Sequence, residues 1–130
     1  MPQSVICLIS ALAFHELTTQ IPHEVHLALT RTSREPVLEY PPIRIYRFSK
    51  ESFAAGIEIH FIDDVSVRIY SAEKTLADCF KFRNKIGLDV ALESLRMYRA
   101  RRRPELQKVL EFARICRVEK VVRPYLEASA

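Results

Sequence analysis

The residues best suited to chemistry in this sequence are the positively charged side chains of its second half. Residues 81–123 hold 13 Lys or Arg against 5 Asp or Glu, a formal charge of +8, whereas residues 1–80 carry −3. Arginine suits phosphate and carboxylate groups because its planar guanidinium donates two parallel hydrogen bonds. The asymmetry indicates an acidic partner, either nucleic acid or an acidic protein groove; the alternative interpretation is a solvated basic helix face.

Eleven of these basic residues are candidate contacts with nucleic acid or with a protein partner. One group surrounds a helix junction at residues 99–103. Another recurs every three residues from 114 to 123, so its members lie near one another along a helical surface. Tyr98 and Tyr125 could add stacking or anchor contacts. The candidates are Lys81, Arg83, Lys85, Arg99, Arg101, Arg102, Arg103, Arg114, Arg117, Lys120 and Arg123.

Motifs for catalysis or for cofactors are missing from the sequence. Gly56 and Gly87 are the only glycines, and a dinucleotide fingerprint or a phosphate-binding loop needs glycine at several closely spaced positions. Neither GxSxG nor HExxH occurs. We therefore expect no catalytic residue, no metal and no cofactor.

Three other groups could be reactive, and each has a simpler interpretation. On a strand, the spacing of His23 and His26 puts them on opposite faces, so they would not converge on a metal. Asp63 and Asp64 could begin the metal site of a nuclease, but no Asp-x-Lys or Glu-x-Lys occurs, and paired aspartates suit a hairpin turn. Cys79 lies among apolar residues at helical spacing, which favours a packed thiol over a nucleophile.

The cysteines and the hydropathy pattern indicate where the chain works. Cys7, Cys79 and Cys116 are odd in number and widely spaced without a CxxC, which argues against a disulfide framework or a zinc site. No stretch has the roughly 18 uninterrupted apolar residues of a membrane span. We expect a soluble cytoplasmic protein that does not enter the membrane.

Hydrophobic periodicity predicts the elements of the first half. An apolar stripe over residues 4–17 predicts a helix capped by Ser4. Alternating residues predict strands over 24–31 and 43–48, and a hairpin formed by 57–62 and 65–70 around the two aspartates. Residues 49–56 have the pattern of a helical turn or loop.

The period becomes helical in the second half. Ser71 is a natural N-cap for a helix whose basic end precedes a break at Gly87, and Leu88–Arg99 forms the next helix. Pro104 suits the first turn of a third helix. A fourth covers about Val118–Leu126, where Pro124 must bend or shorten it. Residues 1–130 thus predict a single α+β domain: an N-terminal helix, about four mostly antiparallel strands, and a C-terminal cluster of three to four helices.

Three stretches together resemble the AbiEi-type family of antitoxins and transcriptional regulators, which belongs to type IV toxin–antitoxin and phage-defence systems. They are VICLISALAFHELTTQIP at 5–22, VRIYSAEKTLADCFK at 67–81 and FRNKIGLDVALESL at 82–95. The resemblance covers nearly the whole chain. It is confined to the C-terminal antitoxin domain of such proteins, so we expect the N-terminal winged helix-turn-helix that reads promoter DNA to be absent here.

The resemblance implies a regulatory role in which the basic surface contacts DNA phosphates or a protein. It also implies a functional link to a nucleotidyltransferase-like toxin, which antitoxins of this family oppose without stable binding. A protein-interaction or homo-oligomerisation module is the alternative, because the apolar first helix needs a cover. A metal-dependent nuclease that uses the two aspartates is the third function considered.

Overall fold

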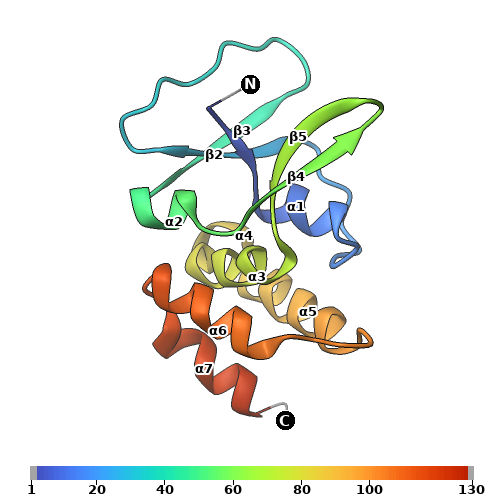
Figure 1. Ribbon diagram of the computed structural model, residues 1–130, viewed down its shortest axis with the longest axis vertical. Coiled ribbons are helices and arrows are strands. Elements are labelled where there is room, and N and C mark those ends of the chain that lie inside the picture. The colour runs from blue at the N-terminus through green and yellow to red at the C-terminus, as the bar shows by residue number, and fades with distance from the viewer. Residues whose placement is uncertain (1–2, 129–130) are drawn as a thin grey trace.

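The strands lie at one end of the molecule and most of the helices at the other in the computed structural model, which describes residues 3–128 (Figure 1). Five strands form one sheet in the order β3-β2-β1-β5-β4. The antiparallel pairing expected for most of the sheet holds for β1–β2 and β4–β5, whereas β1–β5 and β2–β3 are parallel. The strands are β1 (Val5–Ile6), β2 (Val25–Thr30), β3 (Ile43–Phe48), β4 (Ile57–Ile62) and β5 (Val65–Tyr70).

The start of the chain differs from the predicted helix over residues 4–17. Val5 and Ile6 form β1 in the middle of the sheet, and helix α1 covers only Leu8–Phe14. Cys7, not Ser4, is its N-cap. The prediction was wrong at this point because an apolar run has the same composition in a buried strand and in a buried helix.

The other strands occur where their patterns predicted them. β2 and β3 pair in parallel from Val25 opposite Ile43 to Thr30 opposite Phe48, so the carboxyl ends of both strands lie side by side. The hairpin of β4 and β5 turns at Asp63 and Asp64, whose φ angles of 50° and 66° are those of a tight two-residue turn. The aspartates therefore occupy the turn that was predicted for them.

Helices fill the rest of the chain and confirm the α+β prediction. Ser71 caps α3 by accepting a hydrogen bond from the backbone N–H of Lys74 at 3.2 Å. α7 continues through Pro124 instead of ending there, and α6 begins two residues after Pro104. These helices are α2 (Lys50–Ala54), α3 (Ala72–Lys81), α4 (Arg83–Ile86), α5 (Leu88–Arg99), α6 (Leu106–Ile115) and α7 (Glu119–Ala128). None of the described helices has the length and apolarity to cross a bilayer.

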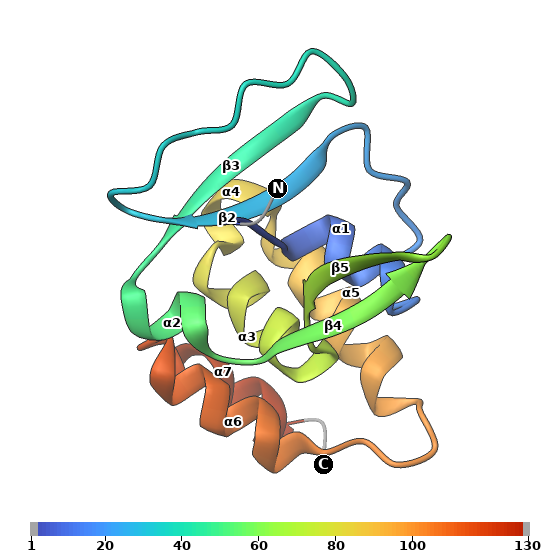
Figure 2. The ribbon, with the colours of Figure 1, turned by 45° about the horizontal axis from the view of Figure 1, so that its top comes forward.

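Helix α3 is the centre of the core. It lies between the sheet and α6, with α1 and α5 packed beside it (Figures 1 and 2). Eight of its ten residues are buried, and they include the charged Lys74 and Asp78. Every element that contributes to the candidate site below packs against α3 or adjoins an element that does.

Gly56 allows the chain to pass closely over α3. Its φ is +78°, and a Cβ added there would lie 2.6 Å from the Cβ of Lys74. We expect Gly56→Ala to lower the free energy of unfolding by about 2 kcal/mol or more, because backbone strain adds to the displacement of a buried side chain. Urea denaturation measures the loss. The control is Ala54→Ser at an exposed position two residues away, which should change stability by less than about 0.5 kcal/mol. A loss below about 1 kcal/mol for Gly56→Ala would contradict the close packing.

Candidate functional site

The main cleft lies where β2 and β3 end. Because these two strands are parallel, the segments that follow them leave the sheet at the carboxyl ends of both strands. There they meet the ends of α3 and α6. The cleft has a volume of about 1020 Å³. Its walls come from residues 30–32, 47–52, 81–82 and 115–117. Clefts at the carboxyl ends of parallel strands are common ligand sites because they are built from segments with free polar groups.

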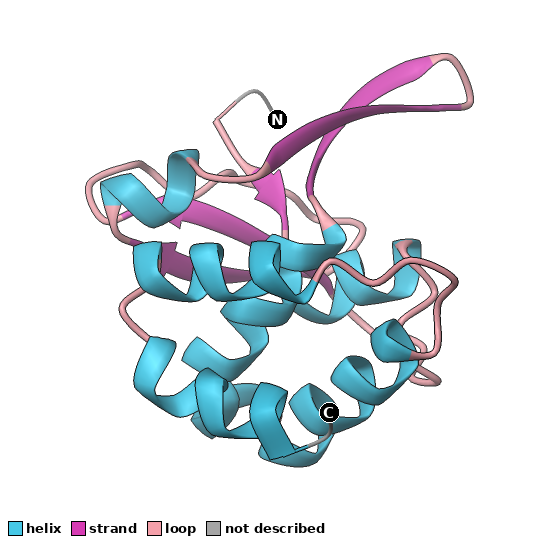
Figure 3. Ribbon diagram, turned by 60° about the horizontal axis from the view of Figure 1, so that its bottom comes forward, coloured by secondary structure: helices cyan, strands magenta, loops and turns pink. Residues whose placement is uncertain are grey.

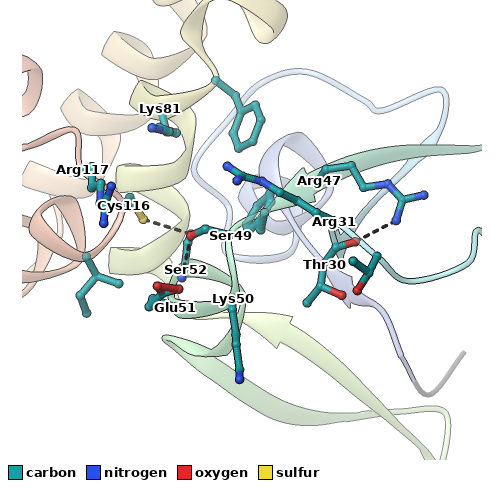
Figure 4. Close-up of a pocket in the computed structure, with 14 residues that line it drawn as sticks. Thr30, Arg31, Arg47, Ser49, Lys50, Glu51, Ser52, Lys81, Cys116 and Arg117 are labelled. Carbon is teal, nitrogen blue, oxygen red and sulfur yellow. Dashed lines mark hydrogen bonds between the residues drawn. The ribbon is translucent and has the colours of Figure 1, made fainter.

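Positive charge dominates the cleft. Five cationic side chains line it and Glu51 is its one acidic residue: the cations are Arg31, Arg47, Lys50, Lys81 and Arg117. In Figure 4, Lys81 and Arg117 come from one wall and Arg31 and Arg47 from the other, whereas Lys50 points away from them. Convergent positive charge of this kind attracts anions and raises their local concentration.

Four of the five cations are available to a ligand. Arg47 donates hydrogen bonds to the carbonyl oxygens of Thr30 at 2.8 Å and Ser33 at 2.5 Å, so it holds the wall together. Within the described residues, the side chains of the remaining four form no hydrogen bond or ion pair, and all four are exposed: Arg31, Lys50, Lys81 and Arg117. The cleft can therefore accept an anionic ligand without breaking an internal ion pair.

A buried ion pair lies beneath this cleft. Nζ of Lys74 is 2.9 Å from Oδ2 of Asp78, and neither side chain has any exposed surface. The same ammonium lies 3.9 Å from the ring centroid of Tyr70 and 4.9 Å from that of Phe48, at cation–π distances. The pair thus joins α3 to the ends of β5 and β3.

Two residues of the cleft complete this buried network. Cys116 donates from Sγ to Oδ1 of Asp78 at 3.4 Å, and Sγ also lies 3.4 Å from Oγ of Ser52. Burial, followed by the negative charge of Asp78, raises the pKa of the Cys116 thiol to about 12. Burial likewise raises the pKa of Asp78, and the ammonium of Lys74 opposes that shift. Cys116 is a protonated donor that fixes the end of α6 against α3.

The predicted basic residues are distributed over separate places. Lys81 and Arg117 lie in the cleft. Arg114, Arg117 and Lys120 line a smaller adjacent hollow of about 270 Å³. There Glu119 accepts hydrogen bonds from Arg123 and Arg114, which lower the pKa of its carboxyl. Arg117 and Lys120 are the members of this group that remain free for a partner within the described residues.

The group at residues 99–103 lies at the other end of α6. Arg99 donates to the carbonyl of Leu126 at 3.3 Å, and Arg101 donates to the carbonyl of His15. These arginines connect α5 to α7 and to the end of α1. Because the ten residues of α6 span about 15 Å, this group and the cleft are not one surface.

The remaining predicted residues have mixed roles. Arg83 donates to the carbonyl of Phe80 at 2.8 Å, inside the junction of α3 and α4. In the described residues, the side chains of Lys85, Arg102 and Arg103 form no hydrogen bond or ion pair, and all three are exposed on other parts of the helical layer. Arginine and lysine in a basic run therefore serve two purposes here, internal connection and surface charge.

Sequence reasoning missed Arg31, Arg47 and Lys50. They belong to a half of the chain with a negative formal charge, so composition did not single them out. Their position directly after or near the end of a predicted strand is the signal that could have found them. If residues 24–31 and 43–48 pair in parallel, Arg31 and Lys50 must lie close together at the carboxyl ends of the two strands.

The groups considered for other chemistry do not gather in the structure. Among residues 3–128, no three His, Cys, Asp or Glu side chains lie close enough to hold a metal ion. All three cysteines are free and buried, and burial raises the pKa of Cys79, which agrees with a packed thiol. His26 is buried against Tyr46, whereas His23 is exposed.

No protein-family model matches this sequence, and no curated protein is similar enough to it to be matched. The resemblance to AbiEi-type antitoxins therefore remains an expectation from the sequence.

Removing one partner of the buried pair should destabilise the protein strongly. We expect Lys74→Met to cost about 3–5 kcal/mol because it leaves the carboxylate of Asp78 buried without a counter-charge. The double variant Lys74→Met/Asp78→Leu should recover much of that loss, because no buried charge remains. Urea denaturation of the wild-type protein, Lys74→Met and the double variant gives the three free energies of unfolding.

The control for this pair is Lys108→Met, which removes an exposed partner of Glu105 and should change stability by less than about 1 kcal/mol. If the double variant is no more stable than Lys74→Met, removing the second buried charge recovers nothing and this account of the core is wrong.

Proposed function

We propose that this chain is a non-catalytic regulatory domain of an AbiEi-like antitoxin and transcriptional regulator, which contacts the phosphates of DNA through its basic cleft. One observation carries the proposal. Three cations without internal partners among the described residues converge on a single cleft: Arg31, Lys81 and Arg117. The resemblance of residues 5–22 and 67–95 to the antitoxin family supports the regulatory part.

The arrangement suits a phosphate polymer. Arg117 lines both the cleft and the adjacent hollow, where Lys120 extends the positive charge along the surface. Contacts to successive phosphates position a protein on a duplex without reading its sequence. This domain would then contribute affinity, and a separate reader would supply the operator sequence.

A protein-interaction module is the second candidate function. The observation that favours it is on strand β4, where Ile59 and Phe61 lie on the same face and are 65% and 76% exposed. Large apolar side chains grouped in this way are typical of surfaces that bind another protein. This surface is built from other elements than the basic cleft, so the two candidate functions do not compete for residues.

DNA binding by the cleft should depend strongly on salt. If three or four phosphates are contacted, a fourfold increase in salt should weaken binding by about 40-fold or more, because each contact releases counterions. The triple variant Arg31→Ala/Lys81→Ala/Arg117→Ala should bind at least about tenfold more weakly at low salt and show a smaller salt dependence. Fluorescence anisotropy with a short labelled duplex at two salt concentrations measures both.

The matched control is Arg44→Ala/Arg96→Ala/Lys108→Ala, which removes the same charge from exposed positions outside the cleft. It should bind DNA much as the wild-type protein does. Equal weakening in both triple variants would show that net charge, not the cleft, accounts for binding. Absence of binding at low salt, or binding that salt does not affect, would refute the DNA part of the proposal.

The antitoxin part has its own test. A nucleotidyltransferase-like gene beside the coding region should encode a toxin whose growth arrest is relieved by coexpression of this chain. Relief should not require a stable complex in a pull-down. Failure to relieve the arrest would reject the antitoxin role and leave the DNA measurement unaffected.

A further inference from the structure

Strand β4 is a free edge of the sheet. It is the last strand in the order β3-β2-β1-β5-β4, so no strand of the described residues pairs with its other side. The hairpin that carries it projects beyond the helical layer, so another protein molecule can approach the outer side of β4 (Figure 3). Four of the six side chains of β4 are exposed: Glu58, Ile59, Phe61 and Ile62.

The pairing with β5 shows which backbone groups face outward. Ile62 and Val65 close the two-residue turn, so they form a hydrogen-bonded pair, and such pairs alternate along an antiparallel ladder. The N–H and C=O groups of His60 and Glu58 therefore point toward β5. Those of Ile57, Ile59 and Phe61 point away from it and toward the free edge.

This edge carries one charged residue, Glu58, but lacks the lysine, proline or bulge that often prevents pairing between molecules. Proteins protect edge strands with lysine, proline or a bulge. β4 contains neither lysine nor proline, and its register with β5 is continuous from Ile57 opposite Tyr70 to Ile62 opposite Val65. Strand edges of this type accept a further strand readily.

We propose that β4 binds β4 of a second copy of this chain, antiparallel and centred on Ile59. In that register Ile59 faces Ile59 of the second copy, and Ile57 faces Phe61. The outward backbone groups of three residues on each strand then form hydrogen-bonded pairs. Shifting the register by two residues in either direction leaves fewer such pairs.

The side chains favour the same register. Glu58 and His60 lie on one face of β4 with a 2.8 Å contact between Oε1 and Nε2. Centring the pairing on Ile59 places Glu58 of each copy directly opposite His60 of the other, at a non-hydrogen-bonded position where side chains approach closely. The other face joins Ile57, Ile59 and Phe61 of the two copies into one apolar strip. Both the polar pair and the apolar strip are therefore self-complementary.

Pairing along one strand buries little area, so we expect a weak dimer in exchange with monomer. This dimer uses none of the cleft residues and does not rest on DNA binding. Sedimentation velocity of the full chain over a wide dilution series should show dimer at high concentration and monomer at low concentration. Ile59→Lys should abolish the dimer, because two ammonium groups would meet at the centre of the interface.

Val65→Lys is the matched control. It places the same charge on an equally exposed apolar position of the same hairpin, on the inner strand rather than the edge, and should leave the dimer intact. A protein that stays monomeric at every concentration would overturn the proposal. So would a dimer that Ile59→Lys does not affect, because its interface would then lie elsewhere.

Single cysteines test the register. Ile59→Cys should form an intermolecular disulfide on mild oxidation, since the two Cα atoms would be about 5.5 Å apart. Phe61→Cys should not, because its Cα atoms would be about 14 Å apart. The three natural cysteines are buried, so they do not compete. Equal cross-linking of both variants would reject the register.

Discussion

The ion pair of Lys74 and Asp78 is the interaction on which the rest of the structure depends. Two charges without exposed surface are stable only while each keeps its partners, because desolvation costs several kcal/mol per ion. Those partners come from four other elements: the rings of Tyr70 and Phe48, the thiol of Cys116 and, through that thiol, Ser52. The ends of β3, β5 and α6 and the start of α2 are therefore held at fixed positions around α3. Four of the five cleft cations, all except Arg31 at the end of β2, are carried by three of these ends and by α3 itself. The buried ion pair therefore fixes the positions of most of the charges that line the cleft.

Local signals in the sequence were sufficient for much of this fold. The hairpin over residues 57–70, the helix 88–99 and the cap at Ser71 depend on neighbours within a few positions, and each was predicted to the residue. Pairing between distant strands has no such signal. β1 has two residues, and the parallel pairing of β2 with β3 is decided by the whole core. The cleft results from that pairing, which is why Lys81 and Arg117 were predicted as binding residues but Arg31, Arg47 and Lys50 were not.

Formal charge overstated the basic surface of the second half. Arg83, Arg99 and Arg101 donate to backbone carbonyls at helix junctions, while Arg114 and Arg123 share the carboxylate of Glu119. Arginine is suited to this internal role because it keeps its charge when partly buried and has several donors. The formal charge of a basic run therefore counts two kinds of residue together: arginines that connect helices and basic residues that are exposed to a partner. The structure is needed to tell them apart.

The two edge strands of the sheet, β3 and β4, lie beside different candidate binding surfaces, and the distance between these surfaces matters for function. The cleft adjoins β3 at one edge, whereas β4 lies at the opposite edge. A dimer formed through β4 would therefore keep both clefts open, at the far ends of one continuous ten-stranded sheet. Each cleft offers few cations, so a single domain would hold a phosphate backbone weakly. Two clefts on one rigid sheet would raise the effective concentration of the second contact, provided that one duplex can reach both. Weak self-association and weak phosphate binding could then combine into useful affinity without any new contact to a base.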